Sequence, residues 1–464
     1  MDLQKLLQER FLFFDGGTGS ILQAAGLAPG ERPELWNISH PEIIENVHYD
    51  YLAAGADIVC SNTFGANRLH FPEKTGEHAL ERVISAGLSC LKRAIARYAE
   101  ESGRRGFAAL DIGPTGRLTQ PMGDLTFDEA YEIFAEIVAL GAKHGADLIA
   151  IETMNDSTEA RAALLAAKEN AQLPVCITCT YNNFGRLLTG AGPENMVVML
   201  QGLGADAIGV NCGLGPEQIL ELVPRFLKYA DRPIIVNPNA GLPHKTDAGT
   251  VYDVTPDVFG GTMEKIAKAG AAILGGCCGT TPDHIAQLVE KTADLQPPRQ
   301  NTCALPVVTS YVTAVEIDGD TVLGTRISAS EDADILAAAK DGDYDALMEA
   351  AMEDIAEGAD VICIDLDGCG PDAAAILPEA VEYLQTMLRA PLCLKSGDSE
   401  ALERAMRIYN GKLLIRPVGA LRAAPEKVLP LVGRYGAVVM TEPDCRAAFQ
   451  AAAGEYGVPL SQIL

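Results

Sequence analysis

The feature that most constrains the fold is an alternation of short apolar segments and helical segments over about the first 295 residues. The apolar segments are rich in β-branched residues, as parallel strands covered on both faces are. They span residues 11–15, 57–63, 107–112, 147–153, 174–180, 206–212, 233–237 and 271–275. Helical segments separate them, among them residues 41–54, 127–144, 157–169 and 216–229. Gly-Ala-Asp recurs at residues 55–57, 145–147 and 204–206, where a glycine that ends a helix is followed directly by a strand.

Eight such units in about 290 residues predict an α/β fold in which the strands close into a (β/α)8 TIM barrel. An open doubly wound sheet is the alternative, but the number of units favours the closed barrel. In these barrels the active site lies at the C-terminal ends of the strands. The polar residues that follow each strand are therefore the candidates for chemistry.

Two strand ends carry cysteines. The segment Gly-Gly-Cys-Cys-Gly-Thr at residues 275–280 follows the last strand, and Cys212 follows the sixth. Three thiolates leave the fourth position of a tetrahedral Zn²⁺ open, as catalytic zinc sites do. A sulfur-rich shell suits a thiol substrate, which loses its proton near neutral pH when it binds zinc. The alternatives are buried small apolar residues or a vicinal disulfide.

Other strand ends suggest an amino-acid binding site. Glu152 follows the fourth strand, and its carboxylate is expected to face the barrel mouth and bind an ammonium group. The alternative for Glu152 is a carboxylate that only organises loops. Asp15 ends the first strand, and Gly16 and Gly17 would expose backbone N–H groups to a substrate carboxylate. This glycine-rich segment lacks the lysine and the spacing of a phosphate-binding loop.

These motifs together resemble the homocysteine S-methyltransferase family. The matching segments are Phe-Asp-Gly-Gly-Thr-Gly at 14–19, Ser-Asn-Thr-Phe at 61–64, Glu-Thr at 152–153, Val-Asn-Cys at 210–212 and Gly-Gly-Cys-Cys-Gly at 275–279. The family includes the N-terminal domain of cobalamin-dependent methionine synthase and the betaine and S-methylmethionine enzymes. The resemblance covers residues 1–295.

The resemblance implies a zinc barrel and a role for each motif. Cys212, Cys277 and Cys278 would hold Zn²⁺, and homocysteine thiolate would take the open position and attack a methyl group. The residues expected to bind the rest of homocysteine are Asp15, Gly16, Gly17, Glu152 and Asn62.

After a predicted linker at residues 296–305, a second alternation covers residues 306–464. Strands are expected at 321–326, 360–365, 391–395, 413–417 and 437–441, and helices at 344–357, 372–388, 399–409, 425–435 and 444–456. Five units are too few for a closed eight-stranded barrel. We therefore expect a smaller α/β domain that resembles a partial TIM barrel, either as an open sheet or as a barrel completed by a partner chain.

This second region resembles the first part of the pterin-binding barrel of methionine synthase. The matches lie at residues 324–328, 343–344, 358–361 and 365–368. Asp367 stands where that family usually has Asn, and Arg-Pro-Val at 416–418 replaces an Asn-Ser strand end. These departures argue against methyltetrahydrofolate binding and favour a structural or docking role. Exposed sheet edges would favour a homodimer.

Composition excludes several classes of partner and location. The net charge of −27 argues against nucleic acid and anionic membranes as partners. No apolar run reaches the roughly 18 residues of a membrane span. Twelve cysteines without a signal peptide indicate a reduced, cytoplasmic protein.

The leading hypothesis is a zinc-dependent homocysteine S-methyltransferase that makes methionine. We expect the methyl donor to be methylcobalamin or another methylcorrinoid carried by a separate protein, because a pterin-barrel remnant is present and no cobalamin domain follows. The alternatives are betaine or S-methylmethionine as donor, methylation of another thiol, or a non-catalytic barrel that binds zinc or a corrinoid partner.

Overall fold

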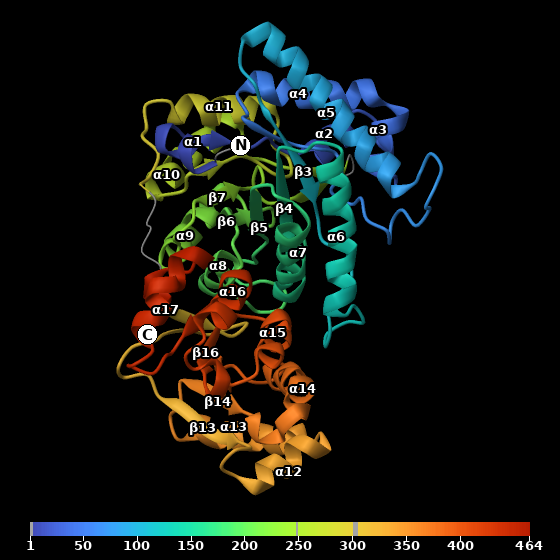
Figure 1. The fold of residues 1–464 in the computed structure, drawn as a ribbon. Coiled ribbons are helices and arrows are strands. Elements are labelled where there is room, and N and C mark those ends of the chain that lie inside the picture. Colours follow the sequence, from blue (N-terminus) through green and yellow to red (C-terminus); the bar gives the residue numbers. More distant parts are fainter. Residues whose placement is uncertain (1–2, 247–248, 300–304) are drawn as a thin grey trace. The chain divides into compact units, whose positions relative to one another are not determined.

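The computed structural model describes residues 3–246, 249–299 and 305–464, and the chain forms two compact units (Figure 1). The first unit contains residues 1–189 and 205–300, and the second contains residues 190–204 and 301–464. Helix α8 (Pro193–Gly202) therefore groups with the second unit, although it follows the fifth strand of the first. Part of the predicted linker, residues 300–304, lies outside the described residues. Within the described ranges, no helix is both long and apolar enough to cross a membrane.

The sheet of the first unit is a closed parallel barrel. Its strands are β1 (Leu12–Phe13), β2 (Ile58–Cys60), β3 (Phe107–Ile112), β4 (Leu148–Met154), β5 (Val175–Cys179), β6 (Ala207–Asn211), β7 (Ile234–Asn237) and β10 (Ile273–Leu274). They pair in the order β1-β10-β7-β6-β5-β4-β3-β2. A bridge between Phe14 and Ile58 joins the two ends of this order, and the Asp15 N–H donates to the Ile58 carbonyl at 3.0 Å. The predicted (β/α)8 barrel is confirmed, and the open sheet is excluded.

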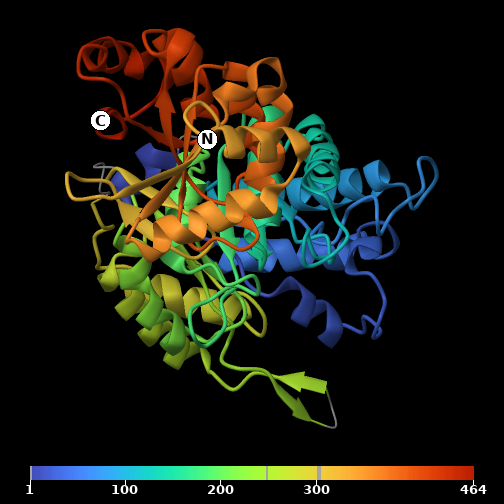
Figure 2. The same cartoon turned by 90° about the horizontal axis from the view of Figure 1, so that it is seen from below.

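Helices follow the strands as expected. The helices after the strands are α4 (Pro41–Ala54), α5 (Leu80–Ser102), α6 (Phe127–Lys143), α7 (Ser157–Asn170), α8, α9 (Pro216–Leu227), α10 (Pro256–Ala269) and α11 (Pro282–Thr292). Shorter elements are α1 (Leu3–Glu9), α2 (Thr18–Ala24), the 3-10 turn Pro33–Leu35 and α3 (Trp36–Ser39). One feature was not predicted, a hairpin of β8 (His244–Thr246) and β9 (Gly249–Val251) that projects from the loop after β7 (Figure 2).

The interior of the barrel is filled by apolar side chains from alternate strand positions. The inward residues include Leu12, Phe14, Ile58, Ala109, Leu148, Ala150, Cys176, Ala207, Ile235 and Ile273. Leu3 and Leu7 of α1 belong to the same buried cluster. Small residues at several of these positions let the facing large ones interdigitate, as close packing requires. The barrel is therefore a packed core, and chemistry is confined to its rim.

The Gly-Ala-Asp repeat fastens neighbouring strands together. The glycine takes a positive φ at the end of a helix, as at Gly55 (φ +109°). The aspartate then accepts the backbone N–H of the preceding strand. The contacts are Phe13 to Asp57 (3.1 Å), Ala108 to Asp147 (2.9 Å) and Val175 to Asp206 (2.8 Å). The motif thus ends a helix and fixes the spacing of two strands.

The second unit contains an open parallel sheet of five strands in sequential order. The strands are β13 (Leu323–Ser328), β14 (Val361–Asp365), β15 (Leu392–Ser396), β16 (Leu413–Pro417) and β17 (Ala437–Val439). The helices are α12 (Ala333–Asp341), α13 (Tyr344–Ala356), α14 (Ala373–Gln385), α15 (Ser399–Ile408), α16 (Pro425–Tyr435) and α17 (Arg446–Ala452). Asp360 repeats the strand contact of the first unit, because it accepts the Val322 N–H at 2.9 Å. The smaller α/β domain is confirmed.

A second hairpin covers the inner face of this sheet. It consists of β11 (Val307–Thr309) and β12 (Ala314–Glu316), which pair antiparallel. Val308 and Val315 of the hairpin pack in one cluster with sheet residues that include Cys393 and Leu414. In a closed barrel this inner face would be covered by the missing strands, so the hairpin supplies the apolar cover that an open sheet needs.

The edges of the open sheet have partners within the chain. At β17 the Leu464 N–H donates to the Val439 carbonyl at 2.8 Å, so the last residues pair along this edge. At the other edge, β13 has a register shift between Gly324 and Ile327. The Arg326 N–H there donates to Asp354 at 3.0 Å. Irregular or covered edges disfavour strand pairing between copies, so the edges themselves give little reason to expect a dimer.

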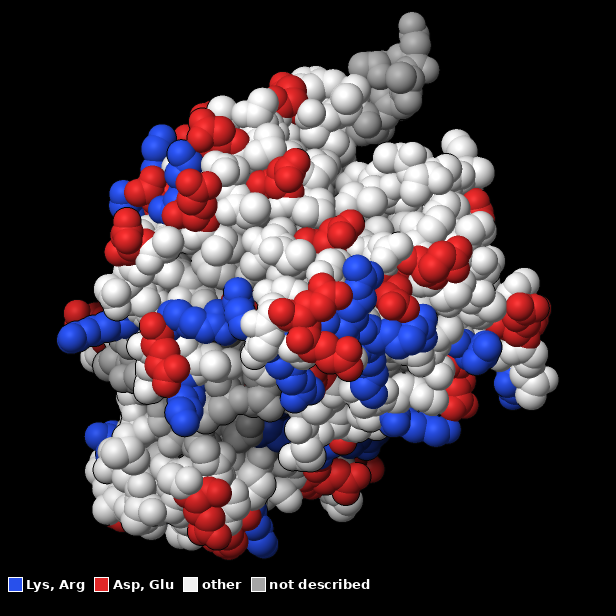
Figure 3. All heavy atoms as spheres, turned by 90° about the horizontal axis from the view of Figure 1, so that it is seen from above, with Lys and Arg blue, Asp and Glu red and all other residues white. Residues whose placement is uncertain are grey.

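Charge on the surface is mixed. Figure 3 shows one face on which Lys and Arg side chains lie interspersed with Asp and Glu. Several charged side chains of the protein are paired, as Arg93 is with Glu45 at 2.7 Å. On the described part of this face there is no continuous basic area of the kind that nucleic acid requires.

Gly209 lies where β6 and β7 are in close contact, and a substitution at this position tests how tight the contact is. A Cβ at this position would lie 1.9 Å from the backbone oxygen of Ile235, so the two strands would have to separate. We expect Gly209→Ala to lower the free energy of unfolding by about 3 kcal/mol, as severe overpacking does. Urea denaturation followed by circular dichroism measures the change.

Gly261→Ala is the matched control, because nothing lies within 4 Å of a Cβ at this position of α10. It should leave stability unchanged or raise it by up to about 1 kcal/mol through helix propensity. Equal effects of the two substitutions would contradict the packing argument.

Candidate functional site

Three cysteines meet at the C-terminal mouth of the barrel. Cys212 follows β6, and Cys277 and Cys278 follow β10, with β7 between these two strands. Their sulfur atoms all lie within 4.8 Å of one another, and the Cys212 and Cys278 sulfurs are 3.8 Å apart. Sulfurs about 2.3 Å from one tetrahedral Zn²⁺ are themselves about 3.8 Å apart. The three partly exposed thiols therefore fit a tetrahedral zinc ion with one position left over.

The backbone is strained beside this cluster. Cys212 and Thr153 are the two non-glycine residues with positive φ in the described chain, at +56° and +64°. Such conformations cost energy in residues with a Cβ and persist only where the surroundings fix them. Thr153 directly follows Glu152, so the strain lies beside two of the predicted site residues.

Asn211 holds the strained Thr153 and directly precedes the strained Cys212, and its contacts could not be read from the sequence. The Thr153 N–H donates to Asn211 Oδ1 at 2.8 Å, and Asn211 Nδ2 donates to Thr153 Oγ1 at 2.8 Å. Asn211 Nδ2 also lies 3.8 Å from the Cys277 sulfur. The residue is fully buried. One amide therefore links the loop after β4 to the cysteine cluster.

The glycines of two loops allow them to pack closely. The Thr280 hydroxyl donates to the Cys277 carbonyl at 2.6 Å and accepts the Gly17 N–H at 3.1 Å. A Cβ at Gly276 would lie 2.3 Å from this hydroxyl oxygen, and one at Gly16 would lie 2.6 Å from it. The predicted residues Gly16 and Gly17 are thus placed against the cysteine loop. The Gly17 amide already has a protein partner in this arrangement.

A second cluster, here called the acid cluster, consists of Asp15, Cys60, Asp111 and Glu152. Oxygens of Asp111 and Glu152 and the Cys60 sulfur lie within 4.8 Å of one another. Asp15 Oδ2 accepts the Cys60 N–H at 2.9 Å. Asp111 is 7% exposed, and its Oδ1 is buried without a hydrogen-bond partner among the described residues. The structure therefore brings Asp15 and Glu152 together as predicted and adds Asp111 and Cys60.

The acid cluster is short of positive charge. Burial raises the pKa of Asp15 and of Asp111, and the charge of Glu152 raises both further. Burial also raises the pKa of Glu152 to about 7, with a contribution from the charge of Cys278. A cation placed among these carboxyl groups would offset both causes, because it replaces lost hydration and cancels the repulsion. The cluster is thus suited to a positively charged group such as an ammonium.

Cys278 receives hydrogen bonds from its neighbours. Those from the Cys212 and Cys277 thiols lower the pKa of Cys278, and the Tyr252 hydroxyl contributes in the same direction. Tyr252 follows β9, and a Cβ at Gly279 would lie 2.3 Å from its ring. The sequence could not reveal this residue, because nothing predicted the hairpin that carries it.

Asn62 serves the loop after β2. Its side-chain amide donates to the Pro33 carbonyl at 2.8 Å and to Asn37 Oδ1 at 2.9 Å, and it is 7% exposed. Both donors of the amide group are therefore used to hold the loop. The structure places Asn62 in the scaffold of the site rather than with the cysteines.

Unpartnered acceptors also lie at the end of β7 and just after it. The Oδ1 atoms of Asn237 and Asn239 are buried, and neither has a hydrogen-bond partner among the described residues. Asn237 Oδ1 lies 2.7 Å from the position of a Cβ at Gly275, just before the cysteine pair. A buried acceptor without a partner costs about 1–3 kcal/mol. This cost is a further indication that a cation or a donor group completes the mouth.

The chain matches one family model and is similar to proteins named methionine synthase. A family model described as homocysteine S-methyltransferase matches residues 12–292. Methionine synthase of Mycobacterium tuberculosis is 28% identical over 462 residues, and that of Mycobacterium leprae is 27% identical over 464. Each alignment covers 95% of this chain and 38% of the relative. The chain thus spans little more than a third of the length of these curated relatives.

Solved structures show the same fold for the first unit. The homocysteine methyltransferase MmuM from Escherichia coli matches in its oxidized form with a TM-score of 0.54 and 23% identity, over 62% of this chain and 97% of that one. Its metallated form matches with a TM-score of 0.53 and 22% identity, over 62% and 99%. Because the family model matches more than half of the chain, this protein belongs to the homocysteine S-methyltransferase family.

Proposed function

We propose that the first unit transfers a methyl group to the thiol of homocysteine and so makes methionine, at a zinc ion held by Cys212, Cys277 and Cys278. The observation that carries the proposal is the 3.8 Å spacing of the Cys212 and Cys278 sulfurs within a three-thiol cluster. This spacing fits tetrahedral zinc with one position left for a substrate. The acid cluster beside it supplies a place for the amino group of the same substrate.

Zinc in this position would lower the pKa of a substrate thiol that completes its shell, so that a thiolate is present at neutral pH. The protein holds the shell by hydrogen bonds to sulfur, from Asn211 to Cys277 and from Tyr252 to Cys278. Such donors orient ligands and withdraw negative charge from them. Both contacts come from side chains outside the ligand set.

The acid cluster would orient homocysteine. An ammonium among Glu152, Asp111 and Asp15 would satisfy the unpartnered Asp111 oxygen and neutralise the buried carboxyl groups. The charge of Cys278 acts directly on Glu152, so the acid cluster and the cysteines are neighbours. A substrate with its thiol at one cluster and its ammonium at the other would be fixed for in-line attack. In that attack the sulfur electron pair forms the new S–CH3 bond, and the donor keeps the electrons of the bond that breaks.

The rim of the mouth favours a large donor. Exposed apolar side chains occur on several of the loops that follow the barrel strands, namely Phe64, Leu118, Met122, Phe184, Leu188, Leu242 and Val251. Phe184 is 85% exposed. Apolar residues grouped around a site are typical of protein interaction surfaces. They support a methylcorrinoid held on a protein as the donor, because betaine and S-methylmethionine are small and need no such rim.

Replacing one cysteine should remove metal and activity together. We expect Cys277→Ser to lower zinc bound per chain and to reduce homocysteine methylation by at least about a hundredfold, because one of the three thiolates that would bind the metal is lost. Metal analysis and X-ray absorption at the zinc edge, with and without homocysteine, measure the site. A fourth sulfur should appear when homocysteine is added to the native protein.

Cys90→Ser is the matched control, because Cys90 is buried away from the cluster and bonds the Asn37 carbonyl as a hydroxyl also can. It should keep both metal and activity. Native protein with full zinc but no transfer from any donor would favour a non-catalytic barrel, and zinc with four sulfurs before homocysteine is added would mean a closed site.

Substitutions in the acid cluster should affect a thiol substrate that carries an amino group more than one that lacks it. We expect Glu152→Gln and Asp111→Asn each to lower kcat/KM for homocysteine about tenfold to a hundredfold, because a hydrogen bond to a charged group contributes about 1.5–3 kcal/mol. Methylation of mercaptobutyrate, which lacks only the amino group, should change little. Steady-state kinetics with both thiols gives the ratio.

Glu217→Gln, at an exposed position in the first turn of α9, is the control. It should leave both thiols unaffected. Equal losses with homocysteine and mercaptobutyrate in the acid-cluster variants would place the two carboxyl groups in a structural role.

The exposed apolar residues on the strand-end loops should affect the KM for a donor that is carried on a protein. We expect Phe184→Ser to raise KM for a methylcorrinoid protein about tenfold, as loss of an exposed aromatic anchor does at an interface. Its rate with free methylcobalamin should stay the same. Met352→Ser, at an exposed position on α13 of the second unit, is the control. Equal losses with both donors would exclude a docking role.

A further inference from the structure

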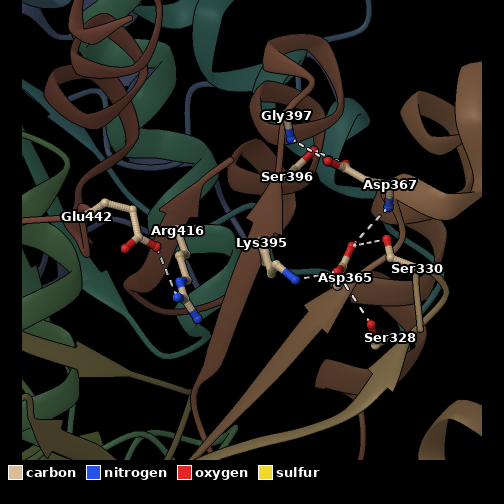
Figure 4. A network of polar contacts seen from close by, with 9 residues as sticks. All are labelled: Ser328, Ser330, Asp365, Asp367, Lys395, Ser396, Gly397, Arg416 and Glu442. Atoms are coloured by element: carbon tan, nitrogen blue, oxygen red, sulfur yellow. Dashed lines mark hydrogen bonds and ion pairs between the residues drawn. The ribbon is translucent and has the colours of Figure 1, made fainter. Parts of the chain in front are cut away.

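A polar row crosses the inner face of the sheet in the second unit (Figure 4). Ser328, Asp365, Lys395 and Arg416 are register partners on β13, β14, β15 and β16. The row lies at the C-terminal end of the strands. Two positions earlier on β14 and β15 come Cys363 and Cys393, which belong to the apolar core of this face. The row is thus placed where an α/β sheet of parallel strands binds ligands.

The carboxylate of Asp365 is fully used, and that of Asp367 is partly used. Asp365 accepts hydrogen bonds from Lys395 Nζ (2.7 Å), Ser330 (3.1 Å), the Asp367 N–H (3.3 Å) and Ser328 (3.4 Å). Asp367 accepts the Ser396 hydroxyl and the Gly397 N–H, both at 2.7 Å. Their contacts hold neighbouring strand ends together (Figure 4). These acids therefore have little capacity left for the N–H groups of a ligand.

The cations have donors to spare. Lys395 carries three N–H donors, and among the described residues its ammonium bonds only Asp365. Arg416 carries five, and its contact is to Glu442 at 3.2 Å. The two residues are register partners on adjacent strands, so their side chains leave the sheet side by side about 4.8 Å apart at the backbone. The open chemistry of the row is therefore hydrogen-bond donation with positive charge.

The two ion pairs differ in strength. Asp365 is 5% exposed and Lys395 is 27% exposed, so this pair is largely shielded from water. Arg416 and Glu442 are each 39% exposed, and such a pair contributes about 0–1 kcal/mol. An acidic ligand can therefore replace Glu442 at little cost, while the pair of Lys395 with Asp365 stays in place.

We infer that Lys395 and Arg416 form a binding site for the carboxylate or phosphate group of a small molecule. A guanidinium binds such oxyanions with two parallel hydrogen bonds, and the neighbouring ammonium adds charge. A pterin ring needs the opposite, because its amino and N–H edge must find acceptors, and Asp365, the carboxylate of the row, already receives four hydrogen bonds. The site is separate from the methyl-transfer site, and its presence does not depend on the function proposed for the first unit.

Isothermal titration calorimetry on the full chain at low ionic strength tests the site with three probes. The probes are succinate, inorganic phosphate and pterin itself, which carries no acidic group. We expect saturable binding of succinate or phosphate, and the preferred one identifies the source of the oxyanion. Lys395→Met/Arg416→Met should weaken that binding at least tenfold. Arg422→Met is the matched control, because Arg422 is an exposed arginine of the same unit paired with Asp444.

The single variant Arg416→Met is a control for misfolding of the double variant. The ion pair of Arg416 is exposed, so the loss of this pair should leave the thermal melt unchanged. It should still weaken oxyanion binding several-fold. The inference is overturned by any of three results: no saturable binding of either anion, anion binding that the double variant leaves unchanged, or saturable pterin binding that neither anion displaces.

Discussion

Closure of the first sheet between β1 and β2 is the constraint on which the site depends. The Phe14 and Ile58 bridge makes one ring of eight strands, so residues far apart in sequence end on one rim. Cys212 and the pair Cys277 and Cys278 lie on either side of β7 and meet with the spacing of metal ligands, and Asp15 after β1 reaches Cys60 of β2 because the ring closes. The same ring brings the acid cluster together from the ends of β1 to β4. In an open sheet with this strand order, β1 and β2 would lie at opposite edges. The members of the acid cluster on these two strands could not then approach each other.

Both units use one local device to build parallel strands. In Gly-Ala-Asp the glycine ends a helix, and the aspartate accepts an N–H at the start of the neighbouring strand, at Asp57 in the first unit and at Asp360 in the second. The device sets strand spacing but not strand number. The second unit stops at five strands, and it covers its inner face with the β11–β12 hairpin and one edge with its last residues. An incomplete barrel is therefore a sufficient fold when other segments supply the missing cover.

The fold and the meeting of the three cysteines were predictable because they rest on patterns local to each segment. Apolar runs gave the strands, and strand ends of a barrel must meet, so Cys212, Cys277 and Cys278 could be placed together without coordinates. Side-chain partners were not predictable in this way. Asn211 acts through a positive φ at Thr153, and Tyr252 acts through a hairpin that has no clear sequence pattern. Asp111 was visible as a strand-end residue, but its missing partner depends on where every neighbouring side chain points.

The strand ends of the two units have opposite electrostatic character, although their architecture is alike. In the first unit, buried carboxyl groups face one another without a cation, and burial and mutual repulsion raise their pKa values. In the second, Asp365 receives four hydrogen bonds from internal donors, and Lys395 and Arg416 keep unused donors beside their ion pairs. Buried carboxyl groups that repel one another favour a cation, whereas spare donors on the two cations favour an oxyanion. Parallel strands therefore supply the position of a site, while the residue at each strand end decides whether it attracts an ammonium or an oxyanion.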